Sequence, residues 1–295
     1  MRGPIFSALT FILLMLAAPA GAADIWISDN PAGNITLEGT ITSGDYEKLR
    51  KLIDENCPGK WTPQCPHRIL LASPGGSLLE AMKIGRLIRK LRLDTAAPVA
   101  GPPSEIRREI ARAMKLKDPD GDWMCASACF FIYVAGIDHR SMLLPGALGI
   151  HRPYLSDADL KALSANQAME SSTPIRTIVE TYLREMGVPS KYADRMLSIS
   201  GDKIYWINDA DFTADFSGII PELKDWMNAK CNKFTDVEKY LMDIQDKKIS
   251  RGEDFTPEET SIRRMLVKKL YAQTTCEADI KDNMREEAWK VYRGL

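Results

Sequence analysis

A serine set among small residues, a histidine and a glycine pair are the most chemically suggestive residues of the 295-residue sequence. Ser127 stands in Cys-Ala-Ser-Ala-Cys, directly before the apolar run 130–136. Gly75 and Gly76 follow an apolar stretch upstream, and His151 lies downstream in Gly-Ile-His-Arg-Pro. A serine hydroxyl needs an imidazole to take its proton, and the oxyanion that it creates needs preorganised N–H donors. The set therefore predicts attack on a carbonyl by Ser127, with His151 as the base.

Each member of this set also has a purely structural alternative. Ser127 taken alone would be a helix cap, which is the usual role of a serine before an apolar run. His151 alone would be a structural histidine beside Arg152, and the glycine pair at 75–76 a strand-to-helix turn. Their occurrence together and in this order favours an active site.

The elements that must position these residues begin as alternating strand and helix patterns. The patterns predict a strand at 34–39, a helix at 45–55, a loop at 57–66, a strand at 68–72 and a helix at 76–91. Such alternation predicts an α/β fold whose parallel sheet is covered on both faces.

Residues 96–123 interrupt this alternation and are predicted to form an insertion before Ser127, because prolines and glycines punctuate them. The Asp-Pro-Asp-Gly-Asp run at 118–122 is interpreted as a solvated turn. A calcium loop would need a bidentate glutamate after it, and none stands at the required place. No metal site is predicted, since His67, His139 and His151 are also few and scattered.

The N-terminal residues indicate export. Arg2 precedes an apolar run at 5–18 and small residues at 20–23, which is the order of a cleavable signal peptide, here placed at 1–23. The mature chain is predicted to be periplasmic or secreted and to contain no integral membrane segment, because no later window is apolar enough. The net charge of −1 argues against nucleic acid as a partner.

Six cysteines in an exported chain predict disulfides. Two short-range pairs follow from spacing, one closing a loop and one spanning a helical turn around Ser127. The third pair lies in two long helical patterns of mixed charge, 222–249 and 257–292, at nearly equal distances from the turn between them. The predicted bridges are Cys57 to Cys65, Cys125 to Cys129 and Cys231 to Cys276. The division into domains is then 24–221 for the α/β domain and 222–295 for a C-terminal helical hairpin extension.

The order of the motifs resembles the ClpP-like serine peptidases of the ClpP/crotonase superfamily, and in particular their exported bacterial relatives. A strand, Ser-Pro-Gly-Gly at a helix start, the serine turn and Gly-Ile-His-Arg-Pro carry this resemblance, over about residues 33–222. It implies a core of repeated β-β-α units arranged as a spiral, to which the C-terminal α-helical extension is added. Cys125 and Cys129 depart from the pattern, because those peptidases carry small residues beside the serine.

The resemblance also implies a role for each site residue. Ser127 matches the nucleophile and His151 the general base, and Asp202 would complete the triad, with Ser200, Asp209 and Asp211 left as neighbours that compete for that role. The oxyanion donors would be the backbone amides of Gly75 and Ala128, and Gly76 would contact the substrate.

The sequence thus favours an exported serine hydrolase that cleaves peptides or exposed protein segments without ATP. No cofactor is expected, and no ATPase partner, because the chain contains no phosphate-binding Gly-x-x-x-x-Gly-Lys-Ser/Thr motif. Assembly into a homo-oligomer is an expectation from the resemblance. The alternative is a catalytically inactive fold that serves as a binding or scaffold protein in the periplasm. A crotonase-like acyl-thioester enzyme is disfavoured, because its coenzyme A is cytoplasmic.

Overall fold

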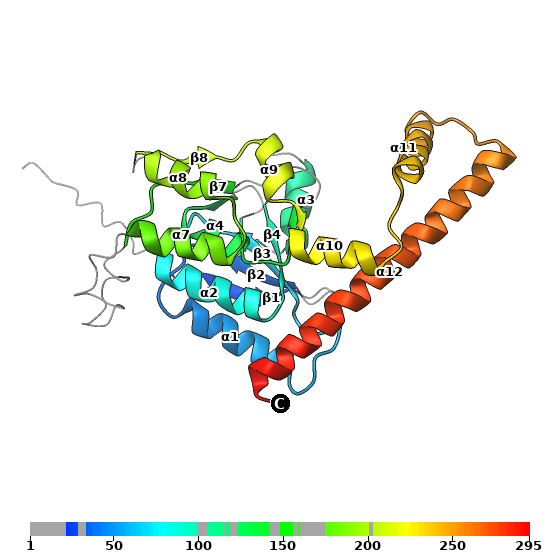
Figure 1. Ribbon diagram of the computed structural model, residues 1–295. Coiled ribbons are helices and arrows are strands. Elements are labelled where there is room, and N and C mark those ends of the chain that lie inside the picture. Colours follow the sequence, from blue (N-terminus) through cyan, green and yellow to red (C-terminus); the bar gives the residue numbers. More distant parts are fainter. Residues whose placement is uncertain are drawn as a thin grey trace, which may run out of the picture.

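The computed structural model shows a mixed α/β body that carries a projecting helical extension (Figure 1). It describes residues 22–28, 34–98, 105–114, 116–118, 123–141, 148–155, 159, 175–200 and 203–295. The predicted signal peptide, apart from its last two residues, lies outside these ranges. So do the turn residues 119–122 and Asp202.

The main sheet has the strand order β1-β2-β3-β4-β6-β9. The four central strands are parallel, as the alternation predicts, whereas β1 and β9 pair antiparallel at the two edges. The predicted strand at 68–72 is confirmed, and the one at 34–39 ends one residue earlier. The strands are β1 (Asp24–Ile27), β2 (Asn34–Glu38), β3 (Arg68–Ala72), β4 (Asp94–Ala97), β6 (Asp138–Ser141) and β9 (Gly218–Ile219).

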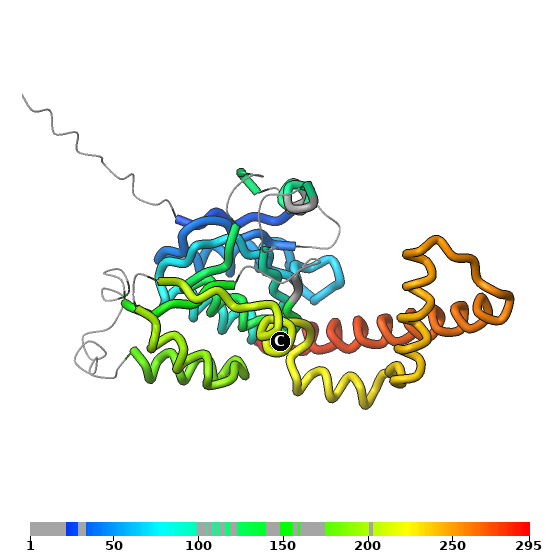
Figure 2. Tube along the Cα trace, turned by 90° about the horizontal axis from the view of Figure 1, so that it is seen from above, coloured from blue at the N-terminus to red at the C-terminus, as the bar shows by residue number. Residues whose placement is uncertain are grey.

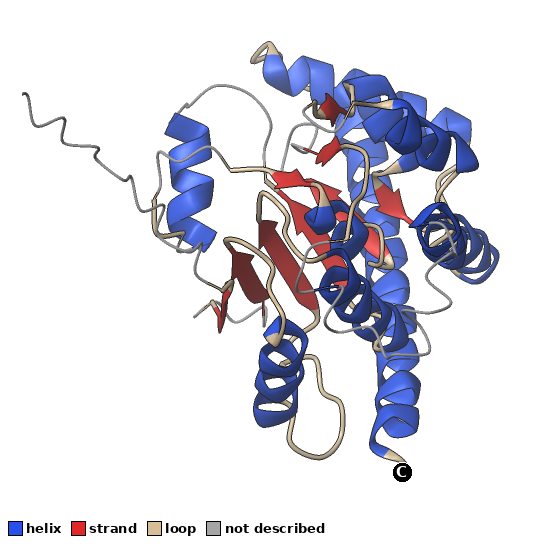
Figure 3. Ribbon diagram, turned by 90° about the vertical axis from the view of Figure 1, so that its left-hand side faces the viewer, coloured by secondary structure: helices blue, strands red, loops and turns tan. Residues whose placement is uncertain are grey.

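Helices lie on both faces of this sheet (Figure 3). Side chains alternate along a strand, so Ile69 and Leu71 of β3 enter the large core, while Leu70 enters a small cluster with Ala111 of α3 (Glu105–Met114). The large core also contains apolar residues of α1 (Asp45–Asn56), α2 (Leu78–Lys90) and α4 (Ala128–Tyr133). The stretch 96–123, predicted as an insertion, thus includes the end of β4 and a helix that covers one face of the sheet.

A second, small sheet brings the predicted site together. Its strand order is β5-β7-β8, with β5 at Cys125–Ala126, β7 at Leu148–Ile150 and β8 at Tyr205–Trp206. The Ser73 amide donates to the carbonyl of Met124 (2.8 Å), which joins β5 to the segment after β3. Because β5 and β7 are parallel, the residues that follow them emerge at the same edge.

The C-terminal extension contains α10 (Pro221–Lys230), α11 (Asp236–Ser250) and α12 (Pro257–Arg293). The prediction for 257–292 is confirmed, but the predicted single helix 222–249 is wrong, because the chain leaves the helix at Cys231 and starts again after Thr235. Thr235 and Glu238 form a capping box that begins α11. Three further helices, α7 (Ile175–Glu185), α8 (Ser190–Ser198) and α9 (Asp209–Asp215), precede the extension.

All six cysteines are paired in the three predicted combinations. The bridge between Cys231 and Cys276, with a Cα–Cα distance of 5.8 Å, closes the base of a segment, residues 232–275, that we call the arm. Two views show the arm projecting away from the α/β body (Figures 1 and 2).

Beyond the arm, α12 runs back along the body and is anchored by buried charges. Lys281 Nζ donates to Asp138 Oδ2 (2.7 Å) and Arg285 Nη2 donates to Asp94 Oδ1 (2.7 Å). Asp94 and Asp138 begin β4 and β6, so α12 contacts the amino ends of these strands. In the described part of the chain, no helix is both long and apolar enough to cross a membrane.

Candidate active site

Ser127 lies in a tight turn between β5 and α4. Its backbone has φ 56° and ψ −122°, and only one other non-glycine residue among those described, Arg92, has a positive φ. A conformation of this kind costs on the order of 1–3 kcal/mol and persists only where the surroundings impose it. Here the Ser127 amide donates to the Gly149 carbonyl (2.9 Å), and the Cys125–Cys129 bridge encloses the turn. The turn holds the hydroxyl away from the core, and Ser127 is half-buried between fully buried neighbours.

His151 follows β7 and contacts the serine. The distance from its Nε2 to Ser127 Oγ is 2.6 Å, and its Nδ1 lies 2.7 Å from the Arg152 carbonyl oxygen. A carbonyl oxygen only accepts, so Nδ1 carries the proton and Nε2 presents a lone pair to the serine hydroxyl. This is the tautomer that a general base requires.

The carbonyl of Arg152 is a site group that the sequence reasoning missed, and the side chain of the same residue is anchored to a neighbouring helix. Arg152 Nη2 donates to the carbonyl of Leu197 at the end of α8 (3.1 Å). Tyr154 stacks on the His151 ring, with 6.1 Å between ring centroids and 25° between the planes. No residue-type pattern signals the carbonyl contact, because every residue has such an oxygen.

Gly75 borders the serine turn, whereas Gly76 packs against Ile41. Gly75 has φ 112°, and a Cβ there would lie 2.5 Å from the Cβ of Ser127 and 2.9 Å from its Oγ. Gly76 has φ 138°, and its Cβ would lie 2.1 Å from the Ile41 carbonyl oxygen. Both positions therefore require glycine, for backbone conformation and for space. In this structure the Gly75 N–H donates to Ser73 Oγ (3.1 Å).

Ala128 is the first residue of α4, whose far end is also fixed. Arg89 donates to the carbonyls of Ala135 (2.8 Å), Val134 (3.0 Å) and Gly136 (3.2 Å), just past the end of the helix. Burial lowers the pKa of this guanidinium, but its ordinary value is so high that it stays charged. The short helix that presents the Ala128 amide is thus held at both ends.

Asp202, the predicted third member, lies outside the described residues. Among the residues that the structure places, no carboxylate hydrogen-bonds to His151. Of the competing neighbours, Asp211 lies in the first turn of α9. Its carboxylate accepts from the Asn208 side chain and from Lys191 of α8, and its backbone N–H donates to Asn208 Oδ1. Asp209, the first residue of α9, makes no hydrogen bond to His151 within the described part of the chain.

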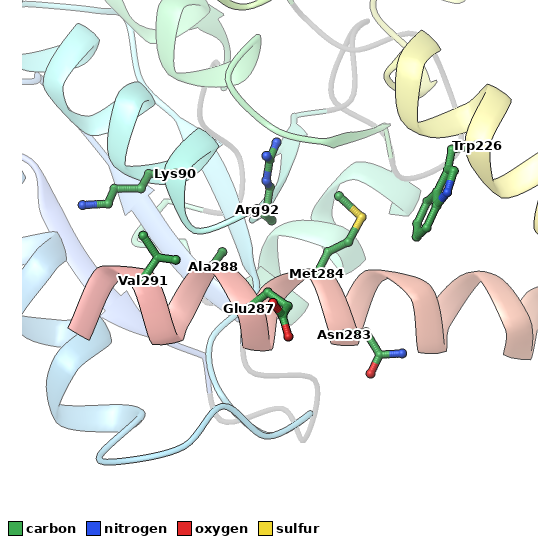
Figure 4. Close-up of a pocket in the computed structure, with 8 residues that line it drawn as sticks. All are labelled: Lys90, Arg92, Trp226, Asn283, Met284, Glu287, Ala288 and Val291. Atoms are coloured by element: carbon green, nitrogen blue, oxygen red, sulfur yellow. The ribbon is translucent and has the colours of Figure 1, made fainter. Parts of the chain in front are cut away.

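A narrow pocket opens beside the Ser127 and His151 pair. Most of its walls are apolar, and the lining residues are Gly76, Leu78, Ser127, Ala128, Phe131, Ile150, His151, Pro153, Tyr154 and Met196. A larger groove of about 460 Å³ lies along α12 (Figure 4). Its lining includes Trp226, Met284 and Val291 but no serine, histidine or cysteine, so it offers no comparable nucleophile and base.

Across the described ranges, no group of three or more His, Cys, Asp or Glu side chains is arranged to bind such an ion. The chemistry that the arrangement offers is that of a hydroxyl, an imidazole and backbone amides.

Comparison with known proteins identifies no family for this chain. No family model matches the sequence, and no curated protein matches it. Among solved structures, the chain is similar to a membrane-bound stomatin-specific protease, 1510-N, at 17% identity and a TM-score of 0.37. That similarity covers 64% of this chain and 81% of the protease chain. So distant a similarity carries no argument about activity, which must come from the site.

Proposed function

We propose that this protein is an exported, ATP-independent serine peptidase of the ClpP-like kind, with Ser127 as the nucleophile and His151 as the general base. The observation that carries the proposal is the 2.6 Å contact between Ser127 Oγ and His151 Nε2. The serine makes this contact from a backbone conformation that is unfavourable for any residue other than glycine. A plain helix cap needs neither the imidazole nor that conformation.

The proposed reaction is acyl transfer through the serine. Ser127 Oγ attacks the peptide carbonyl carbon while His151 Nε2 takes the hydroxyl proton, and the carbonyl oxygen becomes an oxyanion. The C–N bond then breaks, and His151 returns the proton to the leaving amine. Water, deprotonated by the same imidazole, attacks the acyl-enzyme, the ester bond to Ser127 Oγ breaks, and His151 returns the proton to that oxygen. Throughout, the Arg152 carbonyl keeps the Nδ1 proton in place and orients the ring.

The oxyanion would be bound by the amides of Ala128 and Gly75. The Ala128 N–H lies in the first turn of α4, where amides have no partner within the helix. The Gly75 N–H must exchange the Ser73 hydroxyl for the substrate oxygen, a small change because Gly75 already abuts Ser127. One such donor typically lowers the barrier by about 2.7–4 kcal/mol.

The pocket suggests which substrates would fit. Leu78, Phe131, Ile150 and Met196 line it, so an apolar side chain next to the scissile bond would meet an apolar wall there, and Gly76 would contact the substrate from the same pocket. The pocket has a volume of only about 10 Å³ in this structure, so it must widen to admit a side chain. Three disulfides support an oxidising compartment, in line with a signal peptide at 1–23. The arrangement of the core as a ClpP/crotonase-like spiral is part of the same proposal.

An active-site fluorophosphonate probe tests the proposal. The mature protein should be labelled at Ser127, and Ser127→Ala and His151→Ala should each abolish labelling and peptide cleavage. Because the two residues act as a unit, the double variant should be little worse than either single one. Ser250→Ala, which removes an exposed serine at the end of α11, is the matched control and should label normally. Absence of labelling in the folded wild-type protein would instead favour the binding or scaffold alternative.

A second variant separates two ways of orienting His151. If Asp202 completes a triad, Asp202→Asn should lower turnover by several orders of magnitude, as loss of an orienting carboxylate does in serine proteases. Unchanged turnover would assign that role to the Arg152 carbonyl.

A further inference from the structure

A buried carboxylate that the proposed reaction does not use lies at the start of α2. It belongs to Asp159, which is only 1% exposed. Ser77 Oγ donates to Asp159 Oδ1, and the Leu79 amide donates to the same oxygen (3.2 Å). Unpaired amides give the start of a helix a partial positive charge, so a carboxylate is stabilised there. Leu79 and Asp159 are 80 residues apart in the chain, so the contact joins two distant segments.

The first of these segments continues directly from the proposed oxyanion donor. Ser77 is the N-cap of α2 and follows Gly75 by two residues. The backbone here pairs with Ile41, since the Ser77 amide donates to the Ile41 carbonyl (2.8 Å) and the Ile41 amide donates to the Gly75 carbonyl (2.8 Å). The Ser77 hydroxyl has one proton, which it gives to Asp159, and it accepts from the Glu80 amide (3.2 Å). Asp159 therefore fixes the side chain of a residue whose backbone is held by Ile41.

The second segment begins at the proposed general base. Asp159 stands eight residues after His151. Tyr154, which lies between them in the chain, lines the pocket beside the serine, and Gly76 and Leu78 from around the start of α2 line the same pocket. The two segments thus supply the base, one oxyanion donor and part of the pocket, and Asp159 connects them.

From these contacts we infer that Asp159 is a positioning residue, whose carboxylate fixes the Gly75 segment relative to the His151 segment. The inference rests on the proposed function, because it concerns how that site is held in shape. Within the described ranges, Asp159 makes no hydrogen bond to His151, so its role differs from that of a triad acid. Displacement of an oxyanion donor by about 1 Å can lower the rate by about 100-fold.

Variants of both partners test this role through the second-order rate of fluorophosphonate labelling. Asp159→Ala removes both hydrogen bonds and should label about tenfold or more slowly than the wild type. Asp159→Asn keeps an oxygen that accepts from Ser77 and Leu79, so it should recover most of that rate. Adding Ser77→Ala to Asp159→Ala should slow labelling by much less than the product of the two single effects, because both residues act through one contact.

Asp94→Asn is the matched control for the loss of a buried carboxylate. Asp94 is also 1% exposed, but it begins β4, at the end of the central strands away from the serine turn. This variant should label at the wild-type rate wherever urea titrations show that it is folded. In peptide cleavage, Asp159→Ala should lower kcat and raise KM for a peptide with an apolar residue at the scissile bond, whereas a loss of stability alone changes neither constant of the folded protein.

Hydrogen exchange measured by mass spectrometry tests the contact without relying on activity. In Asp159→Ala, peptides that cover residues 73–80 should exchange about tenfold faster than in the wild type, because the Leu79 amide loses its acceptor, while peptides that cover β4 should not change. Failure of the wild type to label would count against the proposed function alone. Labelling of Asp159→Ala at the wild-type rate, an Asp159→Asn variant no faster than the alanine variant, or unchanged exchange over residues 73–80 would each overturn the positioning role of Asp159.

Discussion

Replacing Gly75 by alanine is the sharpest test of how the serine turn is built. The added Cβ would lie 2.5 Å from Ser127 Cβ and 2.9 Å from both Ser127 Oγ and the Ala126 carbonyl oxygen. Carbon atoms in contact prefer about 3.5–4.0 Å, so Ser127 and residue 75 must move apart by about 1 Å. A displacement of this size at a reacting group can lower a rate by about 100-fold.

Gly59→Ala serves as the matched control. Gly59 has φ 100° against 112° for Gly75, but a Cβ there meets nothing within 4 Å. Both variants should lose about 1–2 kcal/mol from the left-handed backbone, and Gly75→Ala should lose more because its Cβ also overlaps Ser127 and Ala126. Only Gly75→Ala should also displace the nucleophile.

The assay compares the second-order rate of fluorophosphonate labelling with the free energy of unfolding in urea. We expect Gly75→Ala to label about 100-fold more slowly than Gly59→Ala under conditions where both are folded. Equal labelling rates in the two variants would refute the argument that Gly75 is glycine because Ser127 stands against it.

Three further predictions concern stability. Lys281→Met should destabilise the protein by about 3–5 kcal/mol in urea titrations, because it leaves the buried Asp138 carboxylate without its 2.7 Å partner, and adding Asp138→Asn should recover part of the loss. A single variant within about 1 kcal/mol of wild type would contradict this. Burial lowers the pKa of His139 to about 4, below its ordinary 6.5, so charging favours the unfolded state and stability should fall by about 3 kcal/mol between pH 6.5 and pH 4. His139→Gln should reduce that pH dependence, and an unchanged profile would count against it. The bridge of Cys125 and Cys129, whose residues are fully buried, should resist reductant in the native state, and alkylation of either thiol before unfolding would show otherwise.

Much of the local structure was predictable because its causes lie within a few residues. The apolar run 68–72 forms β3 over those residues, and the pattern at 257–292 forms α12 with one residue more. The cysteine pairings followed from the export signal, the cysteine spacings and the two C-terminal helical patterns together. The end of α10 near Cys231 was not predicted, although the start of the next helix has a local signal. Thr235 and Glu238, three residues apart, match the capping-box pattern that begins α11.

The candidate site was predictable as a set of residue types but not as a geometry. The sequence by itself determined that Ser127 stands among small residues before an apolar run, that His151 follows Leu-Gly-Ile, and that Gly75 lies at an upstream turn. Only the tertiary structure decided that β5 and β7 pair in parallel, which brings Ser127 Oγ to 2.6 Å from His151 Nε2. It also decided that a backbone carbonyl, that of Arg152, holds the imidazole.

The contact between α12 and the amino ends of the central strands likewise could not be predicted from the sequence. Lys281 and Asp138 are 143 residues apart in the chain and 2.7 Å apart in space. The residue types do not predict this ion pair, because most lysines and aspartates are exposed to solvent and make no buried contact. Helix and strand propensity, caps and close cysteine spacings are set by neighbours along the chain, so the sequence alone determines them. Contacts between distant segments arise only when the packed core brings those segments together, and the orientation of the arm and of His151 depends on that packing.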